Sequence, residues 1–405
     1  MRNQGAVAWL DGSAVSARLG VKPQTLYAYV SRGRIEARPD PSDPRRSLYS
    51  ADDVSRLLER KSAGRKPADV ARGAISWGEP VLASAITDVA GGRLYYRGAD
   101  AAQLAETETI EAVALHLWGC DDAGVFEREP GPRVRLRGSF QARAFAALAA
   151  RAGSEPPALG RGPAALWREG AGLMADLAGA LGEGVEPGPL HLVLARAWGL
   201  GDAEAQLVRR ALVLLADHEL NASTFAARVA ASTGASLSAS VLAGLAALSG
   251  PRHGGVAARL AALVEEASRE GPEAAVRAYI ARGDPPPGFG QRPYPAGDPR
   301  ARALLSAFRP YPELLELQAA GEALTGQPAN IDFALVALTR RLGLQPDAAF
   351  ALFALGRSVG WIAHAIEQLE GGGLIRPRAR YVGPPPILPR ETGEGDRSPK
   401  EATAD

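Results

Sequence analysis

The stretch that decides the fold class is DAAFALFALGRSVGWIAHAIEQ, residues 347–368. Its apolar residues recur every three or four positions, which is the spacing of one face of a helix. The same spacing recurs in ALVLLADHEL at 211–220, ASLSASVLAGLAAL at 235–248 and ARALLSAFRPYPELLELQAAGEAL at 301–324. Strand signals are few, and GGRLYYRG at 91–98 is a candidate hairpin edge. The sequence therefore predicts an all-α fold.

Length and composition are those of an ordinary globular protein. A chain of 405 residues is long enough for two or three domains, and 46% apolar with 22% charged residues is typical of soluble proteins. Every apolar run is interrupted before about 18 residues, and the start MRNQGAVAWLDG has no basic segment followed by an apolar one. We therefore expect neither a membrane span nor a signal peptide. The expected location is the cytoplasm. The single cysteine, Cys120, excludes an intrachain disulfide and a cysteine-rich metal site.

Basic charge is concentrated at the amino-terminal end. Residues 1–68 carry 13 Lys and Arg against 7 Asp and Glu, a net charge of +6, whereas the remainder has 33 against 38, a net charge of −5. A short helix is predicted over 11–19, and a second helix begins at Pro23 and ends at Gly33. Two helices separated by so short a turn indicate a helix-turn-helix. A hairpin-like stretch rich in proline and arginine follows, and then a predicted third helix over 51–61.

The segment GVKPQTLYAYVSRGRI, residues 20–35, resembles the winged, excisionase-type helix-turn-helix of MerR-like regulators. The resemblance implies a DNA-binding domain over residues 1–62. It also implies base contacts from Gln24, Thr25 and Tyr27, and phosphate contacts from Arg32, Arg34, Arg45 and Arg46. The alternative is a protein-docking helix pair with a solvated basic face. DNA is the preferred partner because the basic charge coincides with the helix pattern.

Three other segments are predicted from composition. Residues 63–74 are polar and rich in small side chains, which is typical of a linker. Residues 385–405 are rich in proline and then in charge, which predicts a disordered tail. Residues 121–162 mix Gly, Pro, Arg and Ala without a motif, so no function is assigned to them.

Convergent polar groups are concentrated in four short segments: DHELNAST at 217–224, PRHGG at 251–255, GFGQRPYPAGDPR at 288–300 and ANIDFAL at 329–335. Two later segments add Arg357 and Arg376. Together they supply two imidazoles, a carboxylate beside a helix start and several guanidinium groups. Such a set suits a dianionic substrate held by arginines, with a carboxylate base and an imidazole acting on a second substrate that bears a carbonyl.

These segments resemble the citrate synthase family, over roughly residues 75–384. The resemblance implies a helical fold with a large domain (75–255 and 336–384) and a small domain (256–335). It implies a homodimer that condenses acetyl-CoA, or a related acyl-CoA, with oxaloacetate and then hydrolyses the thioester. By motif position the base is Asp332, the group that stabilises the enol is His253, and the oxaloacetate ligands are His218, Arg300, Arg357 and, from the second subunit, Arg376.

One motif departs from the family, which has a histidine where this chain has Gln291. The amide of Gln291 can donate a hydrogen bond to the ketone of oxaloacetate, but it cannot carry positive charge, so turnover is expected to be slower or the substrate different. CoA contacts are implied for Gly288, Gly290 and Arg292. CoA is expected as a co-substrate, without a permanently bound cofactor, and no metal-ligand spacing is present.

Simpler interpretations stay open for several of these residues. Asp332 could be a carboxylate that interacts with a helix dipole, and His253 a histidine of the core. The other histidines, His116, His191 and His364, are expected to be structural. At the level of the whole chain, the alternative to an enzyme is a metabolite-sensing regulator, in which ligand-driven closure of a catalytically weakened synthase domain alters DNA binding. The enzyme is the preferred hypothesis.

Overall fold

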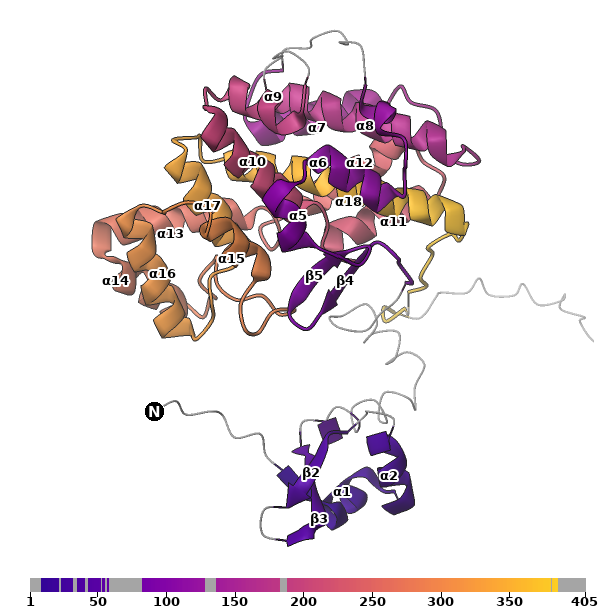
Figure 1. Cartoon of the computed structure of the whole chain (residues 1–405), viewed down its shortest axis with the longest axis vertical. Coiled ribbons are helices and arrows are strands. Elements are labelled where there is room, and N and C mark those ends of the chain that lie inside the picture. Colours follow the sequence, from indigo (N-terminus) through magenta and orange to yellow (C-terminus); the bar gives the residue numbers. More distant parts are fainter. Residues whose placement is uncertain are drawn as a thin grey trace, which may run out of the picture. The chain divides into compact units, whose positions relative to one another are not determined.

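The computed structural model describes residues 9–21, 23–31, 35–40, 43–51, 53–54, 57, 82–127, 136–182, 188–379 and 381–384. The chain divides into two compact units, Met1–Ala83 and Ser84–Asp405 (Figure 1). The predicted linker at 63–74, the predicted tail at 385–405 and most of the predicted helix at 51–61 lie outside the described residues.

The amino-terminal unit combines two helices with a small antiparallel sheet of order β1-β3-β2. Its elements are β1 Trp9–Asp11, α1 Gly12–Leu19, α2 Pro23–Ser31, β2 Ala37–Asp40 and β3 Asp43–Ser50. Asp11 caps α1 by accepting hydrogen bonds from the backbone N–H groups of Ser13 and Ala14. A small core of Val15, Leu19, Leu26, Ile35, Tyr49, Val54 and Leu57 holds these elements together.

The helical unit opens with a second small sheet, in which β4 Thr87–Ala90, β5 Arg93–Tyr96 and β6 Ala99–Asp100 pair in that order. The predicted hairpin at 91–98 therefore exists as the turn between β4 and β5. The all-α prediction is confirmed in that the chain is mostly helical, although each unit also carries a three-stranded sheet.

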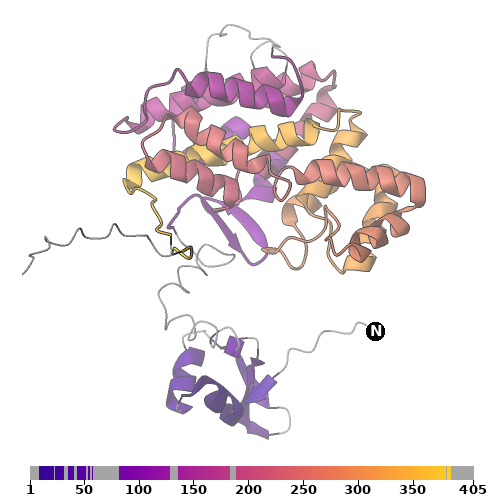
Figure 2. The same cartoon turned by 180° about the vertical axis from the view of Figure 1, so that it is seen from behind.

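Fifteen helical segments follow in the described part of this unit. They are α5 Ala101–Thr107, α6 Ile110–Trp118, the 3-10 helix η1 Ala123–Phe126, α7 Phe140–Ala152, α8 Pro163–Leu181, α9 Leu190–Ala197, α10 Asp202–Leu215, α11 Ala222–Ser232, α12 Leu237–Leu248, α13 Val256–Glu270, α14 Pro272–Ala281, α15 Pro299–Leu305, α16 Pro312–Thr325, α17 Ile331–Arg341 and α18 Ala348–Gly371. Helices α13, α14 and α16 lie together at one side of the unit, as both ribbon views show (Figures 1 and 2). The predicted boundaries of a large and a small domain stay a prediction.

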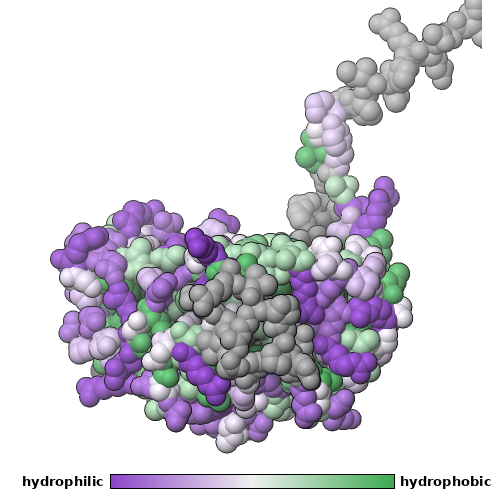
Figure 3. Space-filling view, turned by 90° about the horizontal axis from the view of Figure 1, so that it is seen from above, coloured by the Kyte–Doolittle hydropathy of each residue, from purple (hydrophilic) through white to green (hydrophobic). Residues whose placement is uncertain are grey.

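Helix α18 is the central helix of this unit. It packs against α6, α8, α10, α11 and α12, and almost every one of its side chains is buried. Among the described residues it is the one helix long and apolar enough to cross a membrane, yet that apolar window is entirely buried inside the unit. Hydrophilic side chains predominate on the described surface seen from above, with apolar ones scattered between them (Figure 3). The hydropathy of α18 is therefore explained by its place in the core.

Candidate active site

Five of the predicted site residues lie close enough to influence one another's charge. Arg300 and Arg357 both act on His218, on His253 and on Asp332. These residues come from five segments that are well separated in the sequence. The structure thus brings two imidazoles, two guanidinium groups and one carboxyl into one cluster.

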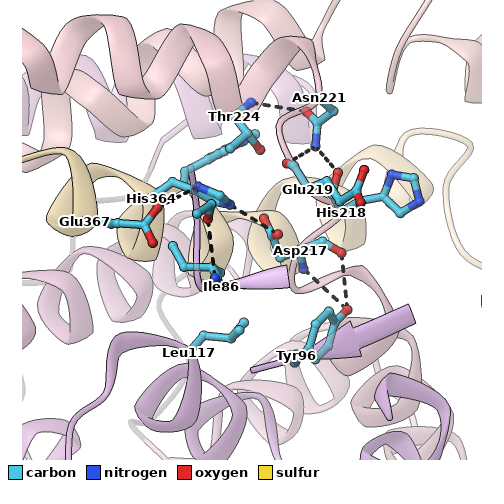
Figure 4. A network of polar contacts seen from close by, with 12 residues as sticks. Ile86, Tyr96, Leu117, Asp217, His218, Glu219, Asn221, Thr224, His364 and Glu367 are labelled. Atoms are coloured by element: carbon cyan, nitrogen blue, oxygen red, sulfur yellow. Dashed lines mark hydrogen bonds and ion pairs between the residues drawn. The ribbon is translucent and has the colours of Figure 1, made fainter. Parts of the chain in front are cut away.

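His218 lies on the loop between α10 and α11. Asn221 shapes this loop, because its side chain caps α11 by accepting from the backbone N–H groups of Ser223 and Thr224 and also donates to the carbonyl of His218 at 3.1 Å (Figure 4). The imidazole is buried, and its Nε2 lies 3.1 Å from the hydroxyl of Tyr294. Burial, with the charges of the two arginines, holds the pKa of His218 well below its usual range. The ring is therefore neutral at physiological pH.

His253 lies in the turn that leads into α13, with its Nε2 facing α11. This nitrogen is 2.9 Å from Ser223 Oγ and 3.3 Å from Asn221 Oδ1. Trp361 Nε1 donates to the same serine hydroxyl at 3.1 Å, so the imidazole is fixed from α18 as well. Burial first, and then the charges of the two arginines, lower the pKa of His253 to about 4. His253 is therefore available as a neutral hydrogen-bonding group whose Nδ1 is not used by these partners.

Arg300 is buried and held by its neighbour Asp298. Both carboxylate oxygens of Asp298 accept from the guanidinium, at 3.0 and 2.8 Å. Asp298 also caps α15 and accepts from the backbone N–H of Ile331 at 3.1 Å, so it ties α15 to the start of α17. Although burial opposes the charge, Asp298 raises the pKa of Arg300 above its ordinary value. Sequence reasoning missed Asp298; its position just before Pro299 at a helix start was the available signal.

Arg357 lies in the middle of α18 with a relative exposure of 1%. Its Nε donates to the carbonyl of Leu215 at 2.8 Å, and its Cζ lies 5.0 Å from the centre of the Phe353 ring. Its Nη2 is buried and has no hydrogen-bond partner among the described residues. Burial lowers the pKa of Arg357 to about 10; the charge of Asp217 raises this pKa, and the charge of Arg300 lowers it further. The guanidinium is therefore still charged at neutral pH. A buried cationic donor without a partner is costly, which points to an anionic ligand.

Asp332 lies in the first turn of α17, whose cap is Asn330. The same asparagine donates to the carbonyl of Gly290 at 3.0 Å, and its own N–H donates to the carbonyl of Gly288 at 2.9 Å. These bonds join the predicted segments at 288–300 and 329–335. Burial of the carboxyl raises the pKa of Asp332 to about 6, with Asp298 adding to the rise and the two arginines opposing it. A helix-start position alone would favour the ionised form, so burial outweighs it here.

Three of the expected site residues are half-buried or exposed. Gln291 is half-buried, and among the described residues its side-chain amide has no hydrogen-bond partner. Arg292 is exposed at the surface. Arg376 is exposed in the segment after α18, where Ile375 N–H donates to Ser232 Oγ at 3.1 Å.

The residues expected to contact DNA lie in the amino-terminal unit. Gln24, Thr25 and Tyr27 are exposed on α2, with Tyr27 at 65%. Arg46 is exposed on β3, 3.5 Å from the carboxylate of Asp43. Arg32, Arg34 and the side chain of Arg45 lie outside the described residues.

His191, His364 and Cys120 lie in the core, whereas His116 is exposed on α6. His116 Nε2 is 2.7 Å from the carbonyl of Tyr96, and His191 is buried on α9. His364 is fully buried and belongs to a polar network beside the cluster (Figure 4). Cys120 is buried and unpaired.

Comparisons with known proteins bear on the sequence and the fold of this unit. Residues 189–378 match the family model of the citrate synthase C-terminal domain. Putative citrate synthase 2 of Mycobacterium tuberculosis is 36% identical over 225 residues, which cover 52% of this chain and 57% of that protein. Citrate synthase 2 of Bacillus subtilis is 36% identical over 192 residues, covering 45% and 52%. The chain thus matches somewhat more than half the length of these curated relatives.

Two solved structures resemble the helical unit over nearly their whole length. Citrate synthase from Thermotoga maritima has a TM-score of 0.62 and 26% identity, covering 78% of this chain and 98% of that one. Citrate synthase from Thermoplasma acidophilum, in a ternary complex with carboxymethyl coenzyme A and oxaloacetate, has a TM-score of 0.65 and 27% identity, covering 76% of this chain and 95% of that one. By sequence over residues 189–378 and by fold over nearly the whole length of these two structures, the helical unit resembles citrate synthases.

Proposed function

We propose that the helical unit condenses an acyl-CoA thioester with oxaloacetate and releases CoA. The observation that carries this proposal is the buried Nη2 of Arg357, which lacks a partner among the described residues and lies beside a second buried arginine. Two guanidinium groups suit the two carboxylates of oxaloacetate. We infer a homodimer, in which Arg376 from the second subunit would complete the anion site. A thiol-release assay with acetyl-CoA and propionyl-CoA, each with oxaloacetate, tests the reaction and the acyl preference.

In this proposal Asp332 is the base that removes a proton from the methyl carbon of the thioester. A carboxylate whose pKa is raised to about 6 is a stronger base than an ordinary one and is still mostly ionised at pH 7. His253 would donate a hydrogen bond to the enolate oxygen as it forms. Because Nε2 faces Ser223, donation has to come from Nδ1. This requires the Ser223 hydroxyl, which donates to Asn221 Oδ1 at 2.7 Å, to turn its proton to Nε2 instead. The resulting enol carbon then attacks the ketone of oxaloacetate.

The ketone oxygen becomes negatively charged when the new carbon–carbon bond forms. Neutral His218 and the amide of Gln291 are the proposed donors to it. Loss of one such donor costs a factor of about 10² to 10³ in rate, and an amide keeps part of that contribution. CoA would approach the backbone at Gly288 and Gly290, with φ angles of +91° and +74°, and the charge of Arg292 suits a phosphate.

We further infer duplex DNA as the partner of the amino-terminal unit. Gln24, Thr25 and Tyr27 form an exposed face of α2, while Leu26 between them is buried. Residues 1–68 carry a net charge of +6, which suits phosphates. If the helical unit binds its ligands but turns over slowly because of Gln291, the whole chain would serve as a metabolite-sensing regulator.

Substituting Arg357 tests the anion site. We expect Arg357→Ala to weaken oxaloacetate binding by about 100-fold or more, since truncating a buried charged partner costs about 2–5 kcal/mol. Arg340→Ala, on the partly exposed end of α17, is the matched control and should leave binding unchanged. Isothermal titration calorimetry measures both. Absence of binding to the unmodified protein at millimolar oxaloacetate would contradict the proposed function.

The pH dependence of condensation tests Asp332. Because the base must be ionised, kcat/KM for the acyl-CoA should fall about tenfold per pH unit below the pKa of about 6. Asp332→Asn should abolish condensation and leave oxaloacetate affinity within about threefold, since the base acts on the other substrate. Thiol-release assays measure the rate of condensation, and calorimetry measures the affinity for oxaloacetate. Residual activity equal to that of the unmodified protein would assign the base elsewhere.

Restoring the histidine tests the departure at position 291. If the amide limits stabilisation of the alkoxide, Gln291→His should raise kcat with oxaloacetate by roughly tenfold or more. Steady-state kinetics of the two proteins side by side decide the matter. A flat or reduced kcat would favour the regulator or a different 2-oxo acid.

DNA binding is tested on the full chain with a fluorescent duplex. We expect affinity to fall at least about tenfold between 50 and 200 mM salt, as phosphate contacts require. Gln24→Glu should weaken binding through repulsion from phosphates, whereas Gln103→Glu, at an exposed glutamine of the helical unit, should not. Equal losses in the two variants, or no binding at low salt, would refute the DNA proposal.

A further inference from the structure

One face of α18 holds the segment that delivers His218 to the site. Three residues of this face, spaced at i, i+3 and i+7, each contact one of three consecutive residues at and after the end of α10. Arg357 Nε donates to the carbonyl of Leu215 at 2.8 Å, Gly360 N–H donates to the carbonyl of Ala216 at 2.9 Å, and His364 Nε2 lies 3.3 Å from Asp217 Oδ2. His218 is the next residue in the chain, so its place follows from these contacts.

The approach of the two segments is too close for a side chain at Gly360. A Cβ there would overlap the carboxylate of Asp217 and lie 2.6 Å from the carbonyl oxygen of Ala216. The peptide of Asp217 is also held from the opposite side, because its N–H and its carbonyl each lie 3.4 Å from the hydroxyl of Tyr96 (Figure 4). The residue before His218 is therefore fixed in both backbone and side chain.

The proton of the His364 imidazole is placed by its neighbours. Arg228 Nη1 lies 3.4 Å from Nδ1, and a guanidinium can only donate. Nδ1 must therefore accept, and the ring proton of a neutral imidazole sits on Nε2, toward the carboxylate of Asp217. His364 and Asp217 are both fully buried, so this hydrogen bond has no competition from solvent.

Arg228 in turn is anchored by the end of α18. Its Nη1 contacts Glu367 Oε2 at 2.6 Å and its Nε donates to Gln368 Oε1 at 3.0 Å. Glu367 also accepts from the backbone N–H of Ala85 at 2.8 Å. Gln368 also donates to the carbonyl of Gly373 at 2.7 Å. The network thus links Ala85 and Gly373, near the two ends of the helical unit, to Asp217, the residue before His218.

We propose that Asp217 and His364 are positioning residues for the anion site. Through the contacts above they set where the imidazole of His218 and the guanidinium of Arg357 lie when oxaloacetate binds. The charge of Asp217 also offsets that of buried Arg357, which an apolar residue at position 217 would not do. This inference rests on the proposed function only in taking oxaloacetate to be the anion that binds.

A pair of substitutions at His364 separates positioning from packing. Gln offers one donor for Asp217 and one acceptor for Arg228, whereas Leu fills a similar volume and offers neither. We expect His364→Leu to raise the KM and Kd for oxaloacetate by about tenfold or more, because small displacements of binding groups are costly, and to leave the KM for the acyl-CoA unchanged. His364→Gln should stay within about threefold of the unmodified protein in all constants. His191→Leu, at a buried histidine on α9, is the control and should not change the oxaloacetate constants.

Nuclear magnetic resonance of protein labelled with ¹⁵N-histidine gives a readout that needs neither turnover nor ligand. The His364 ring should show the Nε2–H tautomer, and the ring signals of His218 should shift in His364→Leu but not in His364→Gln. The opposite tautomer, or unchanged His218 signals in a folded His364→Leu, would overturn the proposal, as would a variant that loses only thermal stability. If the unmodified protein binds no oxaloacetate, the proposed function fails, while these signals still decide the positioning role.

Discussion

Burial of the Arg357 guanidinium in the middle of an apolar core helix is the constraint on which the site depends. A charge in that place is tolerated because the carbonyl of Leu215 accepts from it, Phe353 lies beside it and Asp217 offsets it. The contacts with Leu215 and Asp217 require the end of α10 to lie directly on α18, which the absence of a side chain at Gly360 permits. The same packing leaves Nη2 of Arg357 without a partner among the described residues, and the proposed anion site is based on this unpaired donor.

The electrostatics of the cluster follow from the same two cations. Arg300 and Arg357, together with burial, hold His218 and His253 neutral, so both imidazoles act as hydrogen-bonding groups. Burial has the opposite consequence for Asp332, whose pKa rises toward neutrality and whose carboxylate becomes a better base. One enclosed environment therefore prepares a neutral donor and a stronger base side by side.

Local sequence signals accounted for much of the fold. The three- and four-residue spacing predicted α10, α12, α16 and α18, because a helix that buries one face needs that pattern. The sequence indicated a hairpin in each small sheet, at 91–98 and in the stretch rich in proline and arginine, but it did not indicate β1 and β6, which are only three and two residues long. The helices α7 and α8 within and after the motif-free stretch at 121–162 were missed too, because Ala, Gly and Arg give a weak periodic signal.

The sequence by itself determined which functional groups are present, and its motif order indicated five residues that the structure brings together. It also contained the helix caps that shape the site, Asn221 and Asn330, because a cap acts within a few residues of its own position. Only the tertiary structure decided what surrounds each group. The bond between Asp217 and His364, the unpartnered Nη2 of Arg357 and the shifted pKa values of the cluster all arise between residues remote in the chain. Burial and charge at one atom sum over every neighbour in space, and no local pattern contains that sum.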